Sequence, residues 1–108
     1  MAQLDGEAAL RALADPRRRQ MLMLAWDRER SPTELARSCH LSRPATSQHL
    51  KVLREADLIN VRLEGNRRLY RARADRLAEL RALLDEFWSS RLASLQSGLG
   101  TTGEETRQ

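Results

Sequence analysis

The chain has 108 residues, 41% of them hydrophobic and 31% charged, with a formal net charge of +4, which is typical of one small globular domain. It has no apolar run near the ~18 residues of a membrane span and no signal-peptide pattern, so we expect a cytoplasmic protein that contacts no membrane. The single cysteine excludes an intramolecular disulfide and a paired-cysteine zinc site.

The first quarter of the chain predicts two short helices. Residues 4–14 space leucine and alanine as an amphipathic helix does, and Asp15-Pro16 ends this helix and begins another that runs to about Trp26. Three arginines, residues 17–19, crowd the first turn of the second helix, where the helix dipole disfavours positive charge. We expect that neighbours compensate them or that they contact phosphate or a partner chain.

Two further helix starts predict a helix-turn-helix. Residues 31–34 (Ser-Pro-Thr-Glu) form a capping box with proline at the first helical position, and the helix they begin closes near Cys39. After a turn of about four residues, Ser42 caps a longer helix that extends to about Ala56. A short helix, a tight turn and a second helix form this motif.

A segment with a period of two follows. Ile59, Val61 and Leu63 alternate with polar residues, which indicates a half-buried strand. Gly65-Asn66 supplies a tight turn, after which residues 67–71 return as a second strand. We therefore expect a two-stranded wing beside the helix-turn-helix.

The last predicted element is a long helix. Leucine and aromatic residues recur every three or four positions over 77–95, whereas residues 97–108 are rich in Gly, Thr and Glu and predict a flexible tail. The expected fold is mainly α with a small β-hairpin, a winged helix-turn-helix in the order α-α-α-α-β-β-α. Residues 1–96 would form one DNA-binding and dimerisation domain.

Positive charge is concentrated around this motif. Residues 41–76 carry nine basic and four acidic side chains, whereas residues 77–108 carry three and five. Such a basic segment is typical of an element that binds a polyanion, although a solvated charged face is the alternative.

Four segments together resemble the ArsR/SmtB family of bacterial transcriptional repressors: residues 12–19, 34–36, 41–59 and 64–70. The stretch SRPATSQHLKVLREADLI carries the most specific part of the likeness, which covers about residues 4–95, and the ending FWSSRL is similar to a subgroup without metal boxes. The resemblance implies a homodimer that represses transcription from a pseudo-palindromic operator in double-stranded DNA and releases it when an effector of unknown identity arrives.

The helix that begins at Ser42 would read the DNA. Its candidate contacts are Ser42, Arg43, Pro44, Thr46, Ser47, Gln48, His49 and Lys51. The first turns of a recognition helix reach base edges in the major groove. Gln48 can pair with adenine and Arg43 with guanine or phosphate, whereas Ser47 and Lys51 are suited to phosphate.

The opposite face of this helix is expected to pack on the preceding helices. Thr46, Leu50 and Leu53 lie on one stripe. His49 lies beside that stripe, so packing or a backbone hydrogen bond competes with base reading. An ordinary amphipathic surface helix is the alternative for the whole segment.

The wing supplies four more candidate contacts: Arg62, Asn66, Arg67 and Arg68. The arginines would enter the flanking minor groove, where narrow A·T tracts attract them. A charged hairpin edge that resists aggregation is the alternative.

The apolar stripe of the last helix exceeds what one small monomer buries. A second copy related by a two-fold axis is the simplest partner, and it would place two recognition helices roughly 34 Å apart. The candidate interface residues are Leu4, Leu10, Leu80, Leu84, Phe87, Trp88 and Leu92.

We expect no cofactor and no metal ligand set. Members of the family often hold metals before the recognition helix or on the last helix, but residues 30–33 contain no Cys or His and the last helix no His. Cys39 and His40 remain the candidates for a metal- or thiol-responsive regulator, with Arg37 and Arg43 expected to lower the pKa of the Cys39 thiol. A buried, inert cysteine is the alternative.

Two other functional classes can be compared with a DNA-binding regulator. A winged helix that serves as a protein-interaction module would use its last helix for docking and would lack a steep salt dependence. An enzyme is not expected, because the sequence has no paired carboxylates with a base, no Gly-rich phosphate loop and no nucleophile with a partner histidine at a recognisable spacing.

Overall fold

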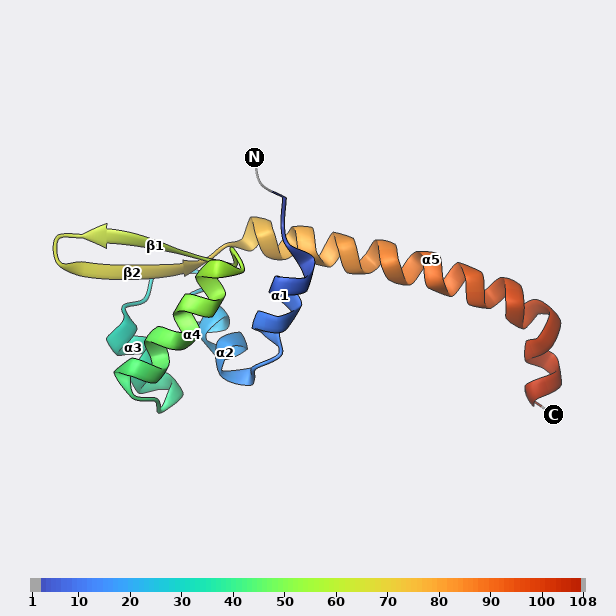
Figure 1. Cartoon of the computed structure of the whole chain (residues 1–108), viewed down its shortest axis with the longest axis horizontal. Helices are drawn as coiled ribbons and strands as arrows, with labels where there is room; N and C mark the ends of the chain where they lie inside the picture. The colour runs from blue at the N-terminus through green and yellow to red at the C-terminus, as the bar shows by residue number, and fades with distance from the viewer. Residues whose placement is uncertain (1–2, 108) are drawn as a thin grey trace.

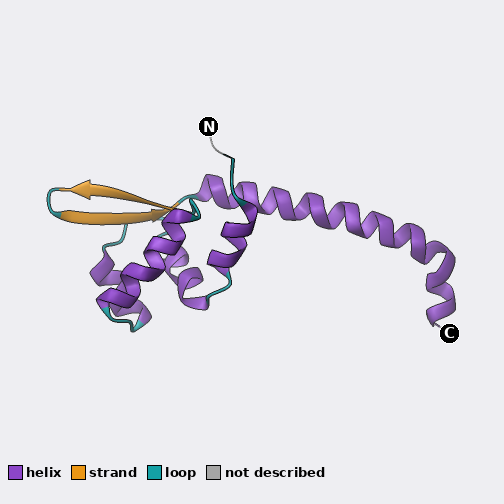
Figure 2. Ribbon diagram, in the orientation of Figure 1, coloured by secondary structure: helices purple, strands orange, loops and turns teal. Residues whose placement is uncertain are grey.

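The structure is a computed structural model that describes the backbone of residues 3–107 and the side chains of residues 3–97. Within this part of the chain the elements are α1 (Gly6–Leu13), α2 (Pro16–Leu24), α3 (Pro32–Cys39), α4 (Arg43–Glu55), β1 (Ile59–Glu64), β2 (Arg67–Ala72) and α5 (Ala74–Arg107) (Figure 1). Figure 2 shows the hairpin projecting from one side of the bundled helices and α5 leaving from the other. The predicted winged helix-turn-helix is confirmed.

The helices begin where side chains cap them. Asp15 accepts a hydrogen bond from the backbone N–H of Arg17 at 2.8 Å. Ser31 and Glu34 form the predicted capping box, in which each side chain accepts from the other residue's N–H, and these bonds hold the pKa of the Glu34 carboxyl below its ordinary value. The Ser42 side chain caps α4 by accepting a hydrogen bond from the N–H of Ala45 at 3.2 Å. These caps set the start of each helix of the motif.

The arginines at the start of α2 are compensated by α1. The guanidinium of Arg18 donates to the carbonyls of Ala12 and Arg11 at 2.6 and 3.1 Å, and that of Arg19 donates to the carbonyl of Leu13 at 2.7 Å. These carbonyls belong to the last turn of α1, where the helix leaves acceptors unpaired and its dipole is negative. Arg18 and Arg19 therefore join two helices.

The core lies between α1–α4, the hairpin and the first turns of α5. Its largest fully buried side chains are Met21, Leu35, Leu50, Leu53, Leu58 and Thr46. Burying a leucine or methionine side chain of this kind contributes about 1.5–3 kcal/mol to stability. Because Leu50 and Leu53 come from α4, the core fixes which face of α4 is turned to solvent.

The hairpin is joined to the helices by a third extended segment. β1 pairs with β2 in an antiparallel register from Ile59–Ala72 to Glu64–Arg67, and Gly65 in the turn has a φ of +62°. Arg30, just before α3, exchanges two backbone hydrogen bonds of 2.8 Å with Tyr70 of β2. The sequence did not predict this pairing, which fixes the base of the wing beside the start of α3.

The last helix extends far beyond the globular part. All side chains from residue 85 to 97 are exposed, and the helix continues through residues 97–107, where the sequence predicted a tail (Figure 1). Extending a helix that already exists adds one hydrogen bond per residue ordered, so the backbone stays helical. The side chains beyond residue 97 lie outside the described residues. None of the described helices has the length and apolar content needed to cross a bilayer.

Candidate nucleic-acid interface

Burial shows which residues lie on the inner face of α4. Leu50 and Leu53 pack in the core as predicted. Thr46 is 0% exposed, and its hydroxyl donates to the carbonyl of Ser42 at 2.9 Å. The inclusion of Thr46 among the DNA contacts is therefore wrong: its side chain points into the core, and its role is to pack and to bond the preceding turn.

The outer face of α4 is open. The predicted contacts Ser42, Arg43, Pro44, Ser47, Gln48 and Lys51 are all exposed. They occupy the N-terminal two thirds of the helix, on the side away from the core. This face has the width and the polarity that a recognition helix presents to the major groove.

A groove of about 400 Å³ separates the start of α4 from the wing. Its lining residues are Ser31, Pro32, Thr33, Arg43, Ser47, Asn66, Arg67, Arg68 and Tyr70. Three of them are arginines and none is acidic, so the groove attracts anions. The residues from the start of α3 were missed by sequence reasoning, although the capping box placed hydroxyl groups there.

Thr33 holds one of the groove arginines. The Arg43 guanidinium donates from Nη1 to Oγ1 of Thr33 at 2.8 Å, which connects the first turns of α3 and α4. A guanidinium fixed by one hydrogen bond keeps its remaining donors for a phosphate or a base edge.

Arg62 does not join the groove. Its guanidinium donates twice to Glu29 at 2.8 Å and once to Glu64 at 3.1 Å. These carboxylates raise the pKa of Arg62, and Arg62 in turn lowers the pKa of Glu29. By contrast, Arg67 and Arg68 have no such ion pair among the described residues and lie exposed beside the turn. The three wing arginines are thus not equivalent.

His49 is turned toward α2 rather than the groove. It is half-buried, and its Nδ1 lies 3.3 Å from Nη1 of Arg18, which identifies that nitrogen as the acceptor. Of the two alternatives for His49, this position favours packing over base reading, and its hydrogen-bond partner is a side chain rather than the backbone.

Cys39 and His40 do not form a reactive pair. Cys39 is 8% exposed, and burial raises the pKa of its thiol, outweighing the opposite effect of Arg17. The expected lowering of this pKa by Arg37 and Arg43 is therefore wrong. His40 has a φ of +55° and closes α3 as its C-cap. Within the described residues, no three Cys, His, Asp or Glu side chains gather to hold a metal ion.

We expect Cys39 to react slowly in the folded protein. A raised pKa leaves less thiolate at any pH below it, and burial restricts access, so an aromatic disulfide reagent at neutral pH should react about tenfold or more slowly than with the unfolded chain. The rate should rise as the pH approaches the raised pKa. Absorbance time courses with and without denaturant measure this; equal rates would contradict the burial of the thiol.

The apolar residues of α5 divide into two groups. Leu80 is 3% exposed and belongs to the core of a single chain, so, contrary to the prediction, its side chain is not available to a partner chain. Leu4 and Leu84 are half-buried against the same core, and Leu10 is exposed. The core of one chain thus takes up only the first turns of α5.

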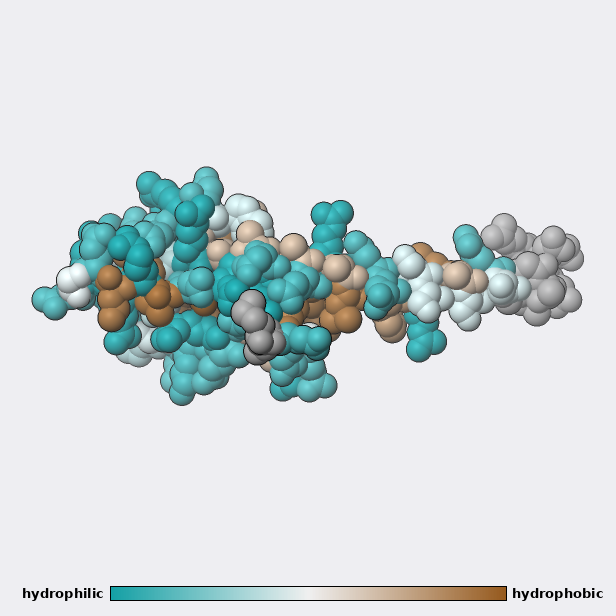
Figure 3. Space-filling view, turned by 90° about the horizontal axis from the view of Figure 1, so that it is seen from above, coloured by the Kyte–Doolittle hydropathy of each residue, from teal (hydrophilic) through white to brown (hydrophobic). Residues whose placement is uncertain are grey.

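The second group is about half exposed, at 47–56%. It comprises the predicted Phe87, Trp88 and Leu92 together with Leu83 and Leu95, which were not among the predicted interface residues. Figure 3 shows apolar surface where α5 leaves the globular part and smaller patches farther along it. The rings of Phe87 and Trp88 meet edge to face, with their centroids 5.6 Å apart.

Comparison with known proteins agrees with this arrangement. Residues 15–61 match the model of the bacterial regulatory protein, arsR family. The HTH-type transcriptional regulator Rv2034 of Mycobacterium tuberculosis is 40% identical over 100 residues, which are 93% of this chain and 94% of that protein.

Two solved structures share the fold. An ArsR-like transcriptional regulator from Rhodococcus sp. RHA1 superposes with a TM-score of 0.73 at 26% identity, over 85% of this chain and 90% of that one. A possible transcriptional regulator for arsenical resistance gives a TM-score of 0.68 at 42% identity, over 82% and 93%. With its winged helix-turn-helix and these similarities, the chain belongs to the ArsR/SmtB family of DNA-binding transcriptional regulators, which are not enzymes.

Proposed function

We propose that the protein is a sequence-specific repressor that binds a pseudo-palindromic operator as a homodimer in the cytoplasm. The observation that carries the proposal is the groove between α4 and the wing, which has three arginines and no carboxylate in its lining. A duplex seated there brings phosphates against the arginines and base edges against the outer face of α4.

The contacts divide by chemistry. Gln48 has the amide that pairs bidentately with adenine, and Arg43 reaches guanine or phosphate from its hydrogen bond with Thr33. Ser47 and Lys51 hold phosphates, which fix the register without specifying sequence. Arg67 and Arg68 extend the contact into the flanking minor groove.

Pairing of two chains through α5 supports the homodimer. The exposed apolar side chains continue the stripe whose first turns are buried in the core. Contiguous apolar surface of this kind marks an interaction site, and a second copy supplies an identical, self-complementary stripe about a two-fold axis.

Repression is the mode of regulation that needs the fewest contacts. A bound dimer occludes a promoter through its DNA face and its pairing face alone, whereas activation needs a further surface for the transcription machinery. Release follows from binding of an effector, which a screen of metals, oxidants and metabolites against the protein–DNA complex would identify.

Fluorescence anisotropy tests the proposal. The labelled duplexes are the DNA upstream of the protein's own gene and a scrambled version, each titrated across a salt series. We expect saturation at two chains per site and specific binding about 1,000-fold or more tighter than scrambled binding. Gln48→Ala should reduce this discrimination by about 5- to 150-fold, the equivalent of 1–3 kcal/mol.

Two outcomes would contradict the proposal. Equal affinity for both duplexes at every salt concentration would leave only the electrostatic attraction and remove the sequence-specific role. No binding to either duplex at low salt would favour the protein-interaction module, with α5 as its docking surface.

A further inference from the structure

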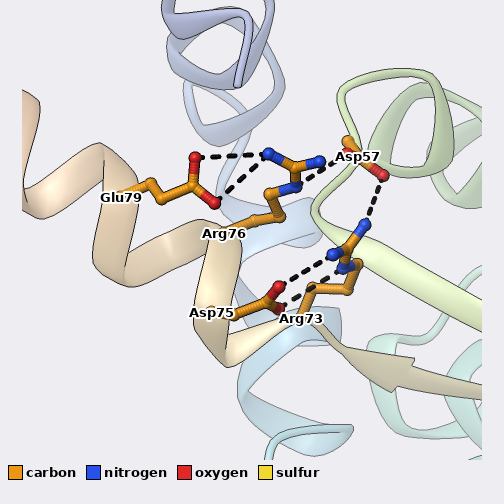
Figure 4. A network of polar contacts seen from close by, with 5 residues as sticks. All are labelled: Asp57, Arg73, Asp75, Arg76 and Glu79. Atoms are coloured by element: carbon orange, nitrogen blue, oxygen red, sulfur yellow. Dashed lines mark hydrogen bonds and ion pairs between the residues drawn. The ribbon is translucent and has the colours of Figure 1, made fainter. Parts of the chain in front are cut away.

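Five charged residues join the end of α4 to the start of α5 (Figure 4). They are Asp57, Arg73, Asp75, Arg76 and Glu79. Asp57 directly follows the C-cap of α4 and has a φ of +65°, and its N–H donates to the carbonyl of Arg54 at 2.9 Å. Its carboxylate is therefore carried rigidly by the end of the recognition helix.

The two oxygens of this carboxylate engage different arginines. Oδ1 accepts from Nη1 of Arg73 at 2.8 Å, and Oδ2 lies 2.8 Å from Nε of Arg76. Arg73 lies between β2 and α5, and its N–H donates to the carbonyl of Leu58 at 2.8 Å, whereas Arg76 lies in the first turn of α5. One side chain thus connects the recognition helix, the wing and α5.

Further carboxylates hold both arginines in place. Asp75 accepts two hydrogen bonds from Arg73, at 2.7 and 3.3 Å, and Glu79 accepts two from Arg76, at 3.2 Å each. The Arg76 side chain is only 9% exposed. The side chains of Asp57, Asp75 and Glu79 are 43%, 63% and 47% exposed, so Arg76 is the buried member of this network. Charged hydrogen bonds with a forked guanidinium are directional, and together these contacts define the angle at the junction and occupy both arginines with carboxylates.

A small rotation at this junction has a large effect at the other end of α4. The helix has 13 residues, which makes it about 20 Å long. A rotation of about 10° about Asp57 would displace its N-terminal turns by about 3.4 Å, which is the rise of one base pair. The spacing between half-sites that a dimer can bind is set by the separation of its two recognition helices, so such a displacement would change that spacing.

We propose that Asp57 is a positioning residue, which fixes the angle between α4 and α5 and thereby the half-site spacing that the dimer accepts. The inference rests on the proposed homodimer, because α5 carries the pairing face and α4 the reading face. Asp57 itself touches no DNA in this assignment.

The test is a panel of duplexes with altered spacing. Half-sites are selected with the wild-type protein from a randomised pool and then separated by spacers one or two base pairs shorter or longer. The affinity of the wild type should fall about tenfold for each base pair by which the spacing departs from the best one. The Asp57→Asn variant should bind the best spacing about tenfold more weakly than the wild type. Its affinities for the different spacings should differ by about twofold at most. The affinity of Asp57→Asn for a single half-site should equal that of the wild type.

Two further variants complete the design. Arg73→Gln releases only one oxygen of Asp57 and should flatten the preference partly, which keeps the test informative if Asp57→Asn fails to fold. Asp85→Asn is the control: it breaks an exposed ion pair on α5, in which Nε of Arg81 lies 3.7 Å from Oδ2 of Asp85. This variant should keep the wild-type preference for half-site spacing. Thermal melting of each variant reports its stability separately.

The outcomes separate this inference from the proposed function. A wild-type protein that ignores spacing would overturn the homodimer on two half-sites and this inference with it. A spacing preference that Asp57→Asn and Arg73→Gln retain would overturn the positioning role alone. A uniform loss on all duplexes, the single half-site included, would show that Asp57 only stabilises the fold.

Discussion

Replacing Trp88 with glutamate is expected to convert the protein into a monomer and to weaken operator binding by at least about 100-fold, because two linked half-site contacts become independent. Trp88 is 56% exposed on the part of α5 that extends beyond the core formed by the described residues. In a two-fold interface the substitution places two carboxylates within the same apolar patch, and unpaired buried charges are strongly unfavourable. Sedimentation velocity measures the mass, and anisotropy measures the binding.

The same substitution at Met23 is the matched control. Met23 is 72% exposed and lies on α2, where it lines a hollow with Leu77 at the start of α5; it is not one of the exposed apolar residues of α5 from Leu83 to Leu95. Met23→Glu should therefore remain dimeric and bind the operator as the wild type does. A dimeric Trp88→Glu variant would rule out α5 as the pairing face.

Replacing both Arg67 and Arg68 with glutamine should lower the affinity of the dimer for any duplex by about 1,000-fold at physiological ionic strength and reduce the slope of log affinity against log salt by about 4, because each chain of the dimer carries both arginines. Both side chains are exposed at the start of β2 and line the groove. In the proposed homodimer each of these side chains is assigned one phosphate at the border of the minor groove, so the replacement removes about four phosphate contacts per site, each with its released counterion. Anisotropy across a salt series measures both quantities on operator and scrambled DNA.

Arg62 provides the internal comparison for this result. Because Arg62 is paired with Glu29, the double replacement Arg62→Gln with Glu29→Gln removes one positive and one negative charge together. It should change the affinity by about twofold at most and leave the salt slope intact. A slope reduced by about 2, one phosphate contact for each chain of the dimer, would mean that Arg62 exchanges Glu29 for a phosphate when DNA binds.

Local signals in the sequence were sufficient to predict where the helices and strands begin. Asp15, Ser31 and Ser42 are caps whose side chains need only neighbours within three residues, so the starts of α2, α3 and α4 could be predicted. The alternation in β1 and the Gly65 turn are local in the same sense.

Contacts between distant segments could not be predicted in this way. Arg62 meets Glu29, 33 residues earlier, and Asp57 meets Arg73 and Arg76 only because the hairpin brings the chain back. No periodicity within one element encodes such a pairing.

It was equally hard to predict which residues at the edge of a helix's apolar stripe are buried. Thr46 is polar and lies on a helix whose other polar residues face solvent, yet its hydroxyl is satisfied by the preceding turn and its methyl group packs in the core. Leu80 belongs to an apolar stripe, and only the packing of α5 on the other helices shows which of its leucines one chain covers.

In the proposed homodimer, the exposed part of α5 would make the stability of the protein depend on its own concentration. Residues 85–97 are exposed along their whole length, so they continue the anchored start of α5 without the tertiary packing that supplies most helical stability in proteins. A partner that binds only the ordered helix stabilises it by mass action. At low abundance the segment would therefore unwind and become a substrate for proteases, whereas paired chains would persist. The cellular lifetime of the regulator would then rise with its own level, in addition to any control of its synthesis.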